Sequence, residues 1–229
     1  METRTPLKTS GIYGGPTSTS AFSFGGREVK VVRPADPDRL LDDPAVRALN
    51  RQDDYMPYWA YLWPGAFLLA EAVGREPWAE GTKALEIGCG LGLAGLVGVG
   101  RGLHVNFTDY DEDSLGFVAR SVEANGFDPS HCTTERLDWR ELPETQYPVI
   151  LGADVLYEHR LVPLVADLLA KMLAPDGFAL VAGPYRVATE GIAQALNARG
   201  LVCEDSSIET DAEMGHVRGT LHRIRRKPA

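Results

Sequence analysis

The sequence predicts an α/β protein with a doubly wound, mostly parallel sheet and an N-terminal extension made of a β-hairpin and a short helix. Short apolar strands alternate with amphipathic helices from residue 84 onward, which is typical of βαβ units. A glycine-rich turn joins the first of these strands to a helix. In such sheets ligands bind beyond the carboxyl ends of the strands, so the site is expected there.

The N-terminal quarter of the chain is predicted to be separate from this alternating pattern. Residues 1–20 are polar and are expected to form a mobile leader, and residues 21–54 form the extension. Within it, apolar and polar residues alternate over 21–33 on both sides of Gly25 and Gly26, which indicates a hairpin. Residues 34–46 then give turns and a short helix, and the main domain occupies 55–229.

In the main domain each element follows from hydrophobic periodicity and from its start and stop signals. The predicted strands are 84–87, 104–109, 132–138, 149–154, 178–182, 202–208 and 218–225, and the predicted helices are 65–73, 91–99, 113–125, 161–173 and 192–199. Pro175, Asp176 and Gly177 are expected to end the fourth of these helices.

Composition narrows the class of protein. The chain has 229 residues, 44% of them hydrophobic, and no apolar run near the roughly 18–20 residues of a membrane span. The N-terminus lacks the apolar centre of a signal peptide, and three cysteines without a CxxC pair favour a reducing, cytoplasmic setting. The net charge of −9 disfavours tight non-specific binding to nucleic acid. Five scattered histidines lack metal-ligand spacing, so no metal site is expected.

The glycine-rich turn predicts a nucleoside-containing cofactor. It runs from Glu86 to Gly95 as EIGCGLGLAG, and Asp109 ends the next strand, where a carboxylate suits the two hydroxyls of a ribose. A pyrophosphate would be repelled by Glu86, whereas the ammonium and sulfonium of S-adenosylmethionine would be attracted. The alternative is that Glu86 caps the following helix or is a satisfied acid at the strand end.

Four further motifs support this interpretation. The sequence LEIGCGLGLAG, followed by TDYD, LDW and GADVLYE, resembles the seven-strand, class I S-adenosylmethionine-dependent methyltransferases. That resemblance implies a Rossmann-like, seven-stranded sheet. The preceding YWAYLWPGAFLLAE is similar to the protein-lysine methyltransferase branch, which includes proteins described as nicotinamide N-methyltransferase-like.

The resemblance implies a role for each matching position. Asp109 matches the ribose-binding acid, and residues 154–158 match the strand end beside the transferable methyl. The remaining matches are Glu86, Gly88, Gly90 and Gly92 under the methionine part, Tyr110 and Asp111 beside the adenosine, and Asp138 and Trp139 at the adenine. Asp109 could instead cap the following helix, Asp111 could be a turn residue, and Trp139 could be a core aromatic.

Five of the nine residues from Tyr55 to Trp63 are aromatic. Aromatic faces attract cations, and both the sulfonium and an arriving ammonium are cations. Trp63 is predicted to wall the cofactor pocket, together with one or two of Tyr58, Trp59 and Tyr61, while the rest of the cluster joins the core. The spacing of Tyr55, Trp59 and Trp63 also allows one helical face to carry all three, although Pro64 argues against α geometry at Trp63.

An amine acceptor must lose a proton before it attacks the methyl group. Asp154, Tyr157 and Glu158 are the candidates to orient or desolvate it, and Tyr185 is predicted to line the acceptor pocket. Tyr157 and Glu158 could instead form the first turn of the next helix, and Arg186 could meet an acidic partner. Because residues 153–157 read ADVLY, without an asparagine-proline-proline motif, a nucleic-acid base is disfavoured as the acceptor.

The leading hypothesis is therefore methyl transfer from S-adenosylmethionine to an amine nitrogen. The acceptor would be a protein lysine by resemblance, or a small nitrogen compound. A nicotinamide-dependent oxidoreductase and a non-catalytic nucleoside-binding module are the alternatives from other classes. The oligomeric state is left open.

Overall fold

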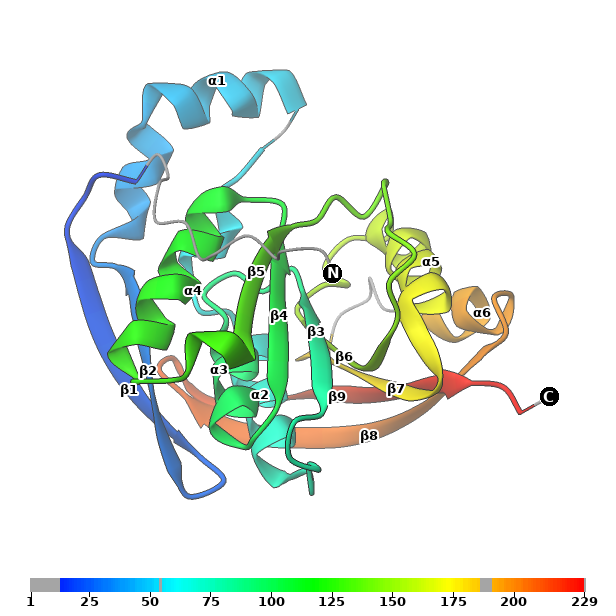
Figure 1. Cartoon of the computed structure of the whole chain (residues 1–229). Coiled ribbons are helices and arrows are strands. Elements are labelled where there is room, and N and C mark those ends of the chain that lie inside the picture. Colours follow the sequence, from blue (N-terminus) through cyan, green and yellow to red (C-terminus); the bar gives the residue numbers. More distant parts are fainter. Residues whose placement is uncertain (1–12, 54, 186–190, 229) are drawn as a thin grey trace.

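The computed structural model describes residues 13–53, 55–185 and 191–228. Its centre is a seven-stranded sheet in the order β5-β4-β3-β6-β7-β9-β8, in which only β9 runs antiparallel to its neighbours (Figure 1). The strands are β3 (Lys83–Ile87), β4 (His104–Asp109), β5 (Cys132–Arg136), β6 (Tyr147–Ala153), β7 (Leu173–Pro184), β8 (Leu201–Ala212) and β9 (Gly215–Arg226). The predicted doubly wound, seven-stranded α/β fold is thereby confirmed.

Helices cover both faces of the sheet and create two hydrophobic cores. One core lies under α2, α3 and α4, and the other lies under α5 and α6. The helices are α2 (Pro64–Arg75), α3 (Leu93–Gly100), α4 (Glu112–Ala124), α5 (Leu161–Met172) and α6 (Ile192–Asn197). The central strands β3 and β6 are buried on both faces, which explains their nearly continuous apolar sequences.

The N-terminal hairpin consists of β1 (Thr17–Phe24) and β2 (Arg27–Pro34). It begins four residues before the predicted start, because the Thr17–Ser20 stretch of the expected leader pairs with residues 31–34. Pro37–Asp42 forms a 3₁₀ helix, η1, and α1 spans Pro44–Asp53, later than the short helix expected within 34–46. Phe24, Val29 and Val31 are buried in the first core, so the hairpin is packed into the main domain.

Side chains of α4 take the place of a further strand along β2. The side chain of Asn125, just after α4, accepts a hydrogen bond from Lys30 N at 2.8 Å and donates one to Lys30 O at 2.6 Å. Ser121 Oγ accepts from Val32 N at 2.9 Å. The backbone groups on this edge of β2 are therefore satisfied by a helix instead of by another strand.

The largest error in the predicted elements concerns β7. It starts at Leu173, directly after α5, and the predicted turn at Pro175–Gly177 lies inside the strand. Tyr147 pairs with Leu173 and Val149 with Phe178, so β7 carries extra residues at this point. An irregularity of this kind places proline and glycine within a strand, where local sequence rules indicate a turn.

The aromatic segment is a 3₁₀ turn followed by extended chain. Tyr58–Ala60 forms η2, and Trp63 is the extended residue before α2, as Pro64 predicts. Trp59 is buried against Phe117, with ring centroids 5.5 Å apart, whereas Trp63 is 38% exposed. The hypothesis of one helical face carrying Tyr55, Trp59 and Trp63 is therefore wrong. Among the described residues, no helix is long and apolar enough to cross a membrane.

Candidate active site

The glycine turn after β3 is held in a conformation that larger residues resist. Gly88 and Gly90 have φ values of 54° and 52°. A Cβ atom on Gly88 would lie 3.1 Å from the ring of Trp139, so this indole packs directly against the turn. Burial raises the pKa of the Cys89 thiol, which is consistent with a small filler among the glycines.

Glu86 is buried at 2% exposure beneath this turn. Its Oε2 accepts a hydrogen bond from Gly95 N at 3.1 Å, so the carboxyl caps the first turn of α3, the local role that the sequence left as an alternative. Burial raises its pKa to about 8, although the bond from Gly95 opposes the shift. A cation bound at this turn would favour the ionised form.

Asp109, at the end of β4, faces the same turn. Its Oδ2 accepts from Gly90 N at 2.8 Å and its Oδ1 from Asp111 N at 3.0 Å. Burial raises its pKa to about 6. Asp111 caps α4 by accepting from Asp113 N, which agrees with the expected turn role, and it also accepts a hydrogen bond from the Tyr55 hydroxyl.

Asp138 lies on the loop after β5 and is clamped by Arg140, whose guanidinium donates to both carboxylate oxygens. The bonds from Arg140 lower the pKa of Asp138 to about 2. Arg136 stacks over the Tyr110 ring, 4.6 Å from its centroid. Asp138 is thus an ionised, partly exposed acid on the same loop as Trp139, but Arg140 already occupies it.

Asp154, at the end of β6, is the one non-glycine residue with positive φ, 53°, in the described chain. Its Oδ2 accepts a hydrogen bond from Gly65 N at 2.5 Å, in the first turn of α2. A Cβ on Gly65 would lie 2.4 Å from that oxygen, so the helix must carry glycine here. A strained backbone and a helix N-terminus together hold this carboxylate in one place.

An aromatic rim adjoins Asp154. Tyr58 packs edge-to-face on Tyr157 and on Trp63, with centroids 5.7 and 5.8 Å apart. Trp63 donates its indole N–H to Tyr58 O at 2.8 Å. All three rings remain 37–43% exposed. They therefore form a partly open wall, which we call the aromatic rim.

The loop after β6 also carries Glu158, which is paired with Arg160. The α5 helix begins only at Leu161, so the alternative that Tyr157 and Glu158 form its first turn is wrong. Burial raises the pKa of Tyr157, which keeps the phenol protonated.

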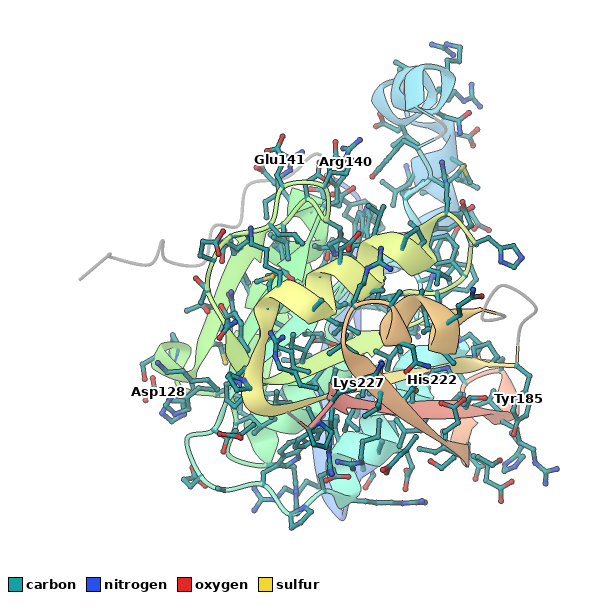
Figure 2. The ribbon with its side chains drawn as sticks, turned by 90° about the vertical axis from the view of Figure 1, so that its right-hand side faces the viewer. Asp128, Arg140, Glu141, Tyr185, His222 and Lys227 are labelled. Atoms are coloured by element: carbon teal, nitrogen blue, oxygen red, sulfur yellow. The ribbon has the colours of Figure 1, made fainter. Side chains whose placement is uncertain are left out.

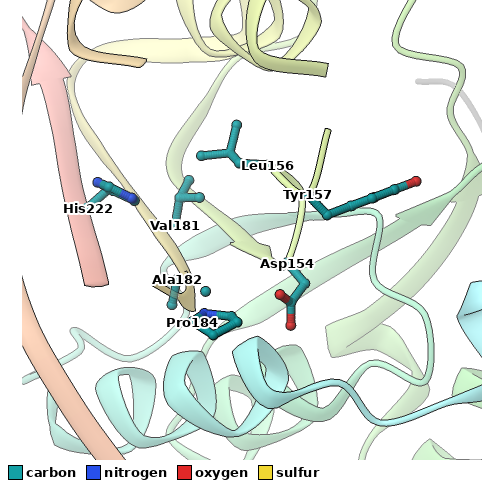
Figure 3. Close-up of a pocket in the computed structure, with 8 residues that line it drawn as sticks. Asp154, Leu156, Tyr157, Val181, Ala182, Pro184 and His222 are labelled. Atoms are coloured by element: carbon teal, nitrogen blue, oxygen red, sulfur yellow. The ribbon is translucent and has the colours of Figure 1, made fainter. Parts of the chain in front are cut away.

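A shallow pocket opens at the ends of β6 and β7, with Asp154 and Tyr157 on its wall (Figure 3). Pro184 and His222 also line this pocket. Tyr185 lies outside it, 63% exposed, with its hydroxyl 2.8 Å from Ser207 Oγ. Figure 2 shows Tyr185 far across the surface from Arg140. Arg186 falls outside the described residues.

The residues at this edge fit a cationic nucleoside cofactor. At Gly90 a Cβ would meet Trp59 O at 3.5 Å, an ordinary contact distance, so the backbone is open to close approach there, and the carboxyls of buried Glu86 and half-buried Asp109 flank the turn. Burial raises the pKa of both carboxyls, so a bound cation would favour their ionised forms. Trp139, packed against Gly88, and the aromatic rim supply flat ring surfaces at this edge of the sheet.

Sequence reasoning missed three contributors. Tyr55 ties the start of the aromatic segment to Asp111. Ser114 donates to Gly90 O at 2.6 Å and so fixes the turn from α4. His222 reaches the pocket because β9 lies next to β7. No local motif marks these residues, since each acts through tertiary pairing.

Comparison with known proteins places this architecture among the methyltransferases. A ribosomal protein L11 methylase from Lactobacillus delbrueckii subsp. bulgaricus superposes with a TM-score of 0.55 at 17% identity, covering 70% of this chain and 78% of the other. The chain therefore has the seven-stranded methyltransferase fold.

The sequence comparisons go further. Residues 60–191, more than half of the chain, match the lysine methyltransferase family model. EEF1A lysine methyltransferase 3 of Xenopus tropicalis is 32% identical over 42% of this chain and 44% of its own length. Protein N-lysine methyltransferase METTL21A of Danio rerio is 31% identical over 53% and 59%. The chain belongs to the lysine methyltransferase family, and it spans about half the length of these relatives.

Proposed function

We propose that this protein transfers a methyl group from S-adenosylmethionine to the side-chain nitrogen of a lysine in another protein. The observation that carries the proposal is the fixed Asp154 carboxylate beside the aromatic rim, at the strand edge that also bears the glycine turn. The family match and the names of the two relatives support a protein lysine as the acceptor.

The cofactor would be held by the turn and by the acids around it. Glu86, Gly88, Gly90 and Gly92 would lie under its methionine part, and Asp109 would bind its ribose. Tyr110, Asp111, Asp138 and Trp139 would enclose its adenosine, with Trp63 near the sulfonium. Bound there, the cofactor supplies an activated methyl group on a positively charged sulfur.

The chain's own contribution is alignment and exclusion of water. Asp154 would hold the acceptor nitrogen by accepting an N–H hydrogen bond, and Tyr157 with Tyr58 and Trp63 would surround the alkyl stem of the lysine. Because the rim is partly exposed, it suits the end of a long side chain presented by a large partner. Glu158, paired with Arg160, and Tyr185, on the outer surface, would contact the partner instead of the reacting atoms.

The test is transfer of label from radiolabelled S-adenosylmethionine into an extract of the host cells, divided by a size filter. Label on one protein band, mapped to lysine, supports the proposal. Label only in the filtrate would replace it with methylation of a small nitrogen compound. Asp154→Asn should abolish the labelling while still binding cofactor in calorimetry, and Asp176→Asn, on the sheet away from this edge, is the matched control.

We also propose that the protein works in a reducing compartment. Cys89, Cys132 and Cys203 are all free thiols in the structure, and a thiol persists in a reducing compartment such as the cytoplasm.

A further inference from the structure

Strand register brings together three reactive side chains that are distant in the sequence. In the β8–β9 pair, Asp205 lies directly opposite His222, and Cys203 lies two residues before Asp205 on the same face. Asp205 Oδ1 is 2.7 Å from His222 Nδ1 and 2.9 Å from Cys203 Sγ. The cluster is asymmetric, because the His222 side chain is 5% exposed and that of Asp205 is 56% exposed.

The contact with Asp205 fixes the state of the imidazole. A carboxylate can only accept a hydrogen bond, so Nδ1 of His222 must carry the proton. In a neutral ring the lone pair is then on Nε2. Nε2 makes no hydrogen bond with any residue that the structure describes.

The free side of this ring faces the shallow pocket at the ends of β6 and β7. His222 pairs with Val181 of β7, and both line the pocket with Asp154 and Tyr157. Figure 3 shows His222 and Asp154 on opposite sides of it. A polar group that enters the pocket would therefore meet the imidazole, while Asp154 Oδ2 lies against Gly65 N at the start of α2.

We propose that His222, oriented by Asp205, is the general base that removes the proton from the acceptor ammonium before methyl transfer. This inference rests on the proposed function. The N–H bond of the ammonium breaks, its electron pair stays on the nitrogen, and the proton binds to Nε2. Nδ1–H stays hydrogen-bonded to Asp205, and the proton leaves Nε2 for solvent after the product has gone.

The charges around the ring favour this step. Asp205 is hydrogen-bonded to the ring and Asp154 lines the same pocket, and both are carboxylates, which stabilise an imidazolium. Cys203 and Tyr157 stay neutral, since burial raises the pKa of each. The β7 residues on the pocket wall carry no titratable side chain. A raised thiol pKa also argues against Cys203 acting as a nucleophile.

The test compares the pH dependence of kcat for wild type, His222→Gln and Asp205→Asn. The substrate is the acceptor protein that the labelling experiment identifies. His216→Gln is the matched control, because His216 is also paired with a β8 acid, Asp211, at 3.0 Å but lies half-exposed and away from the pocket. Calorimetry with S-adenosylmethionine shows whether each variant is folded.

Loss of a general base lowers the rate by about 10²–10⁴-fold near neutral pH. His222→Gln should show that loss in kcat with cofactor affinity unchanged, and the loss should shrink towards pH 10, where free lysine deprotonates unaided. Asp205→Asn should lose about tenfold or more, and His216→Gln should match wild type.

An equal loss at every pH would overturn the proposal, because it would indicate a structural role. Wild-type rates in Asp205→Asn would also overturn the proposal. That variant is the deciding one if His222→Gln does not fold. A metal ion in the purified protein, with activity lost to a chelator, would also overturn it by making Nδ1 a ligand. If wild type itself labels no protein, the proposed function fails, whereas an active wild type with an equally active His222→Gln refutes only the base.

Discussion

The contact between Gly65 and Asp154 makes a sharp prediction for Gly65→Ala. The new Cβ would lie 2.4 Å from Asp154 Oδ2, 2.7 Å from its Cγ and 2.9 Å from Ala182 O, far inside normal contact distances. Overpacking costs about 1–3 kcal/mol and a lost charged hydrogen bond about 1.5–3 kcal/mol, against a gain of about 0.5–1 kcal/mol for alanine in a helix. These terms give a net loss of about 1.5–5.5 kcal/mol.

Two assays follow this variant. For a chain of this size, Tm should fall by about 3–22 °C in differential scanning calorimetry. Displacing the Asp154 carboxylate by about 1 Å should lower kcat by about 100-fold, while cofactor affinity changes little. Gly100→Ala is the control, because its Cβ would meet only Phe127, at 3.6 Å, and it should keep wild-type Tm and rate. A Gly65→Ala protein with wild-type Tm and kcat would refute the role given to this contact.

Three further predictions concern the cofactor side. Trp63→Ala should weaken S-adenosylmethionine binding about 3–30-fold in calorimetry, because one aromatic ring that attracts the sulfonium is lost. Trp78→Phe is the control. An unchanged affinity would show that Trp63 does not contact the cofactor. Cofactor affinity should rise as pH increases from about 6 to 8, because a cation prefers the ionised forms of Asp109 and Glu86, whose pKa values are raised to about 6 and 8; a flat profile would contradict this. The pKa of Glu86 is about 8 in the folded state and 4.5 in the unfolded state, so the folded state holds the proton of this carboxyl more tightly. The folded state without cofactor should therefore lose stability between about pH 4.5 and 8, by about 1.4 kcal/mol per pH unit. Below about pH 6 Asp109 adds a loss of the same sign, because its pKa is also raised, so Glu86→Gln should flatten the curve between about pH 6 and 8 in urea denaturation measured at each pH. A slope in that range equal to that of wild type would show that Glu86 is not its source.

Local sequence signals predict the parts of the fold that depend on neighbouring residues. Strands β3 and β6, and the helices that follow the glycine turn and Asp109, were predicted because hydrophobic periodicity and capping act over a few residues. The start of β7 was not, because its pairing with β6 overrides the turn preference of Pro175 and Gly177. The start of β7 is therefore set by tertiary pairing with β6.

The candidate site divides in the same way. Motifs predicted Glu86, Asp109 and Asp154 at one edge of the sheet, and the structure brings them to that edge. The local partners could not be predicted, since Gly65 reaches Asp154 through the packing of α2 and Arg140 reaches Asp138 through the path of a loop. His222 lay beyond motif reasoning altogether, because its neighbours depend on the register of β8 against β9.

The replacement of a strand by α4 along β2 has a consequence for the order of synthesis. The hairpin leaves the ribosome before α4, because Ser121 and Asn125, which satisfy its edge, lie 89 and 95 residues further along the chain. At about 5–20 residues per second, that interval is about 5–20 s. During it the edge of β2 lacks the partners that Ser121 and Asn125 supply, and Val29 and Val31 lack the core against which they are buried in the folded chain.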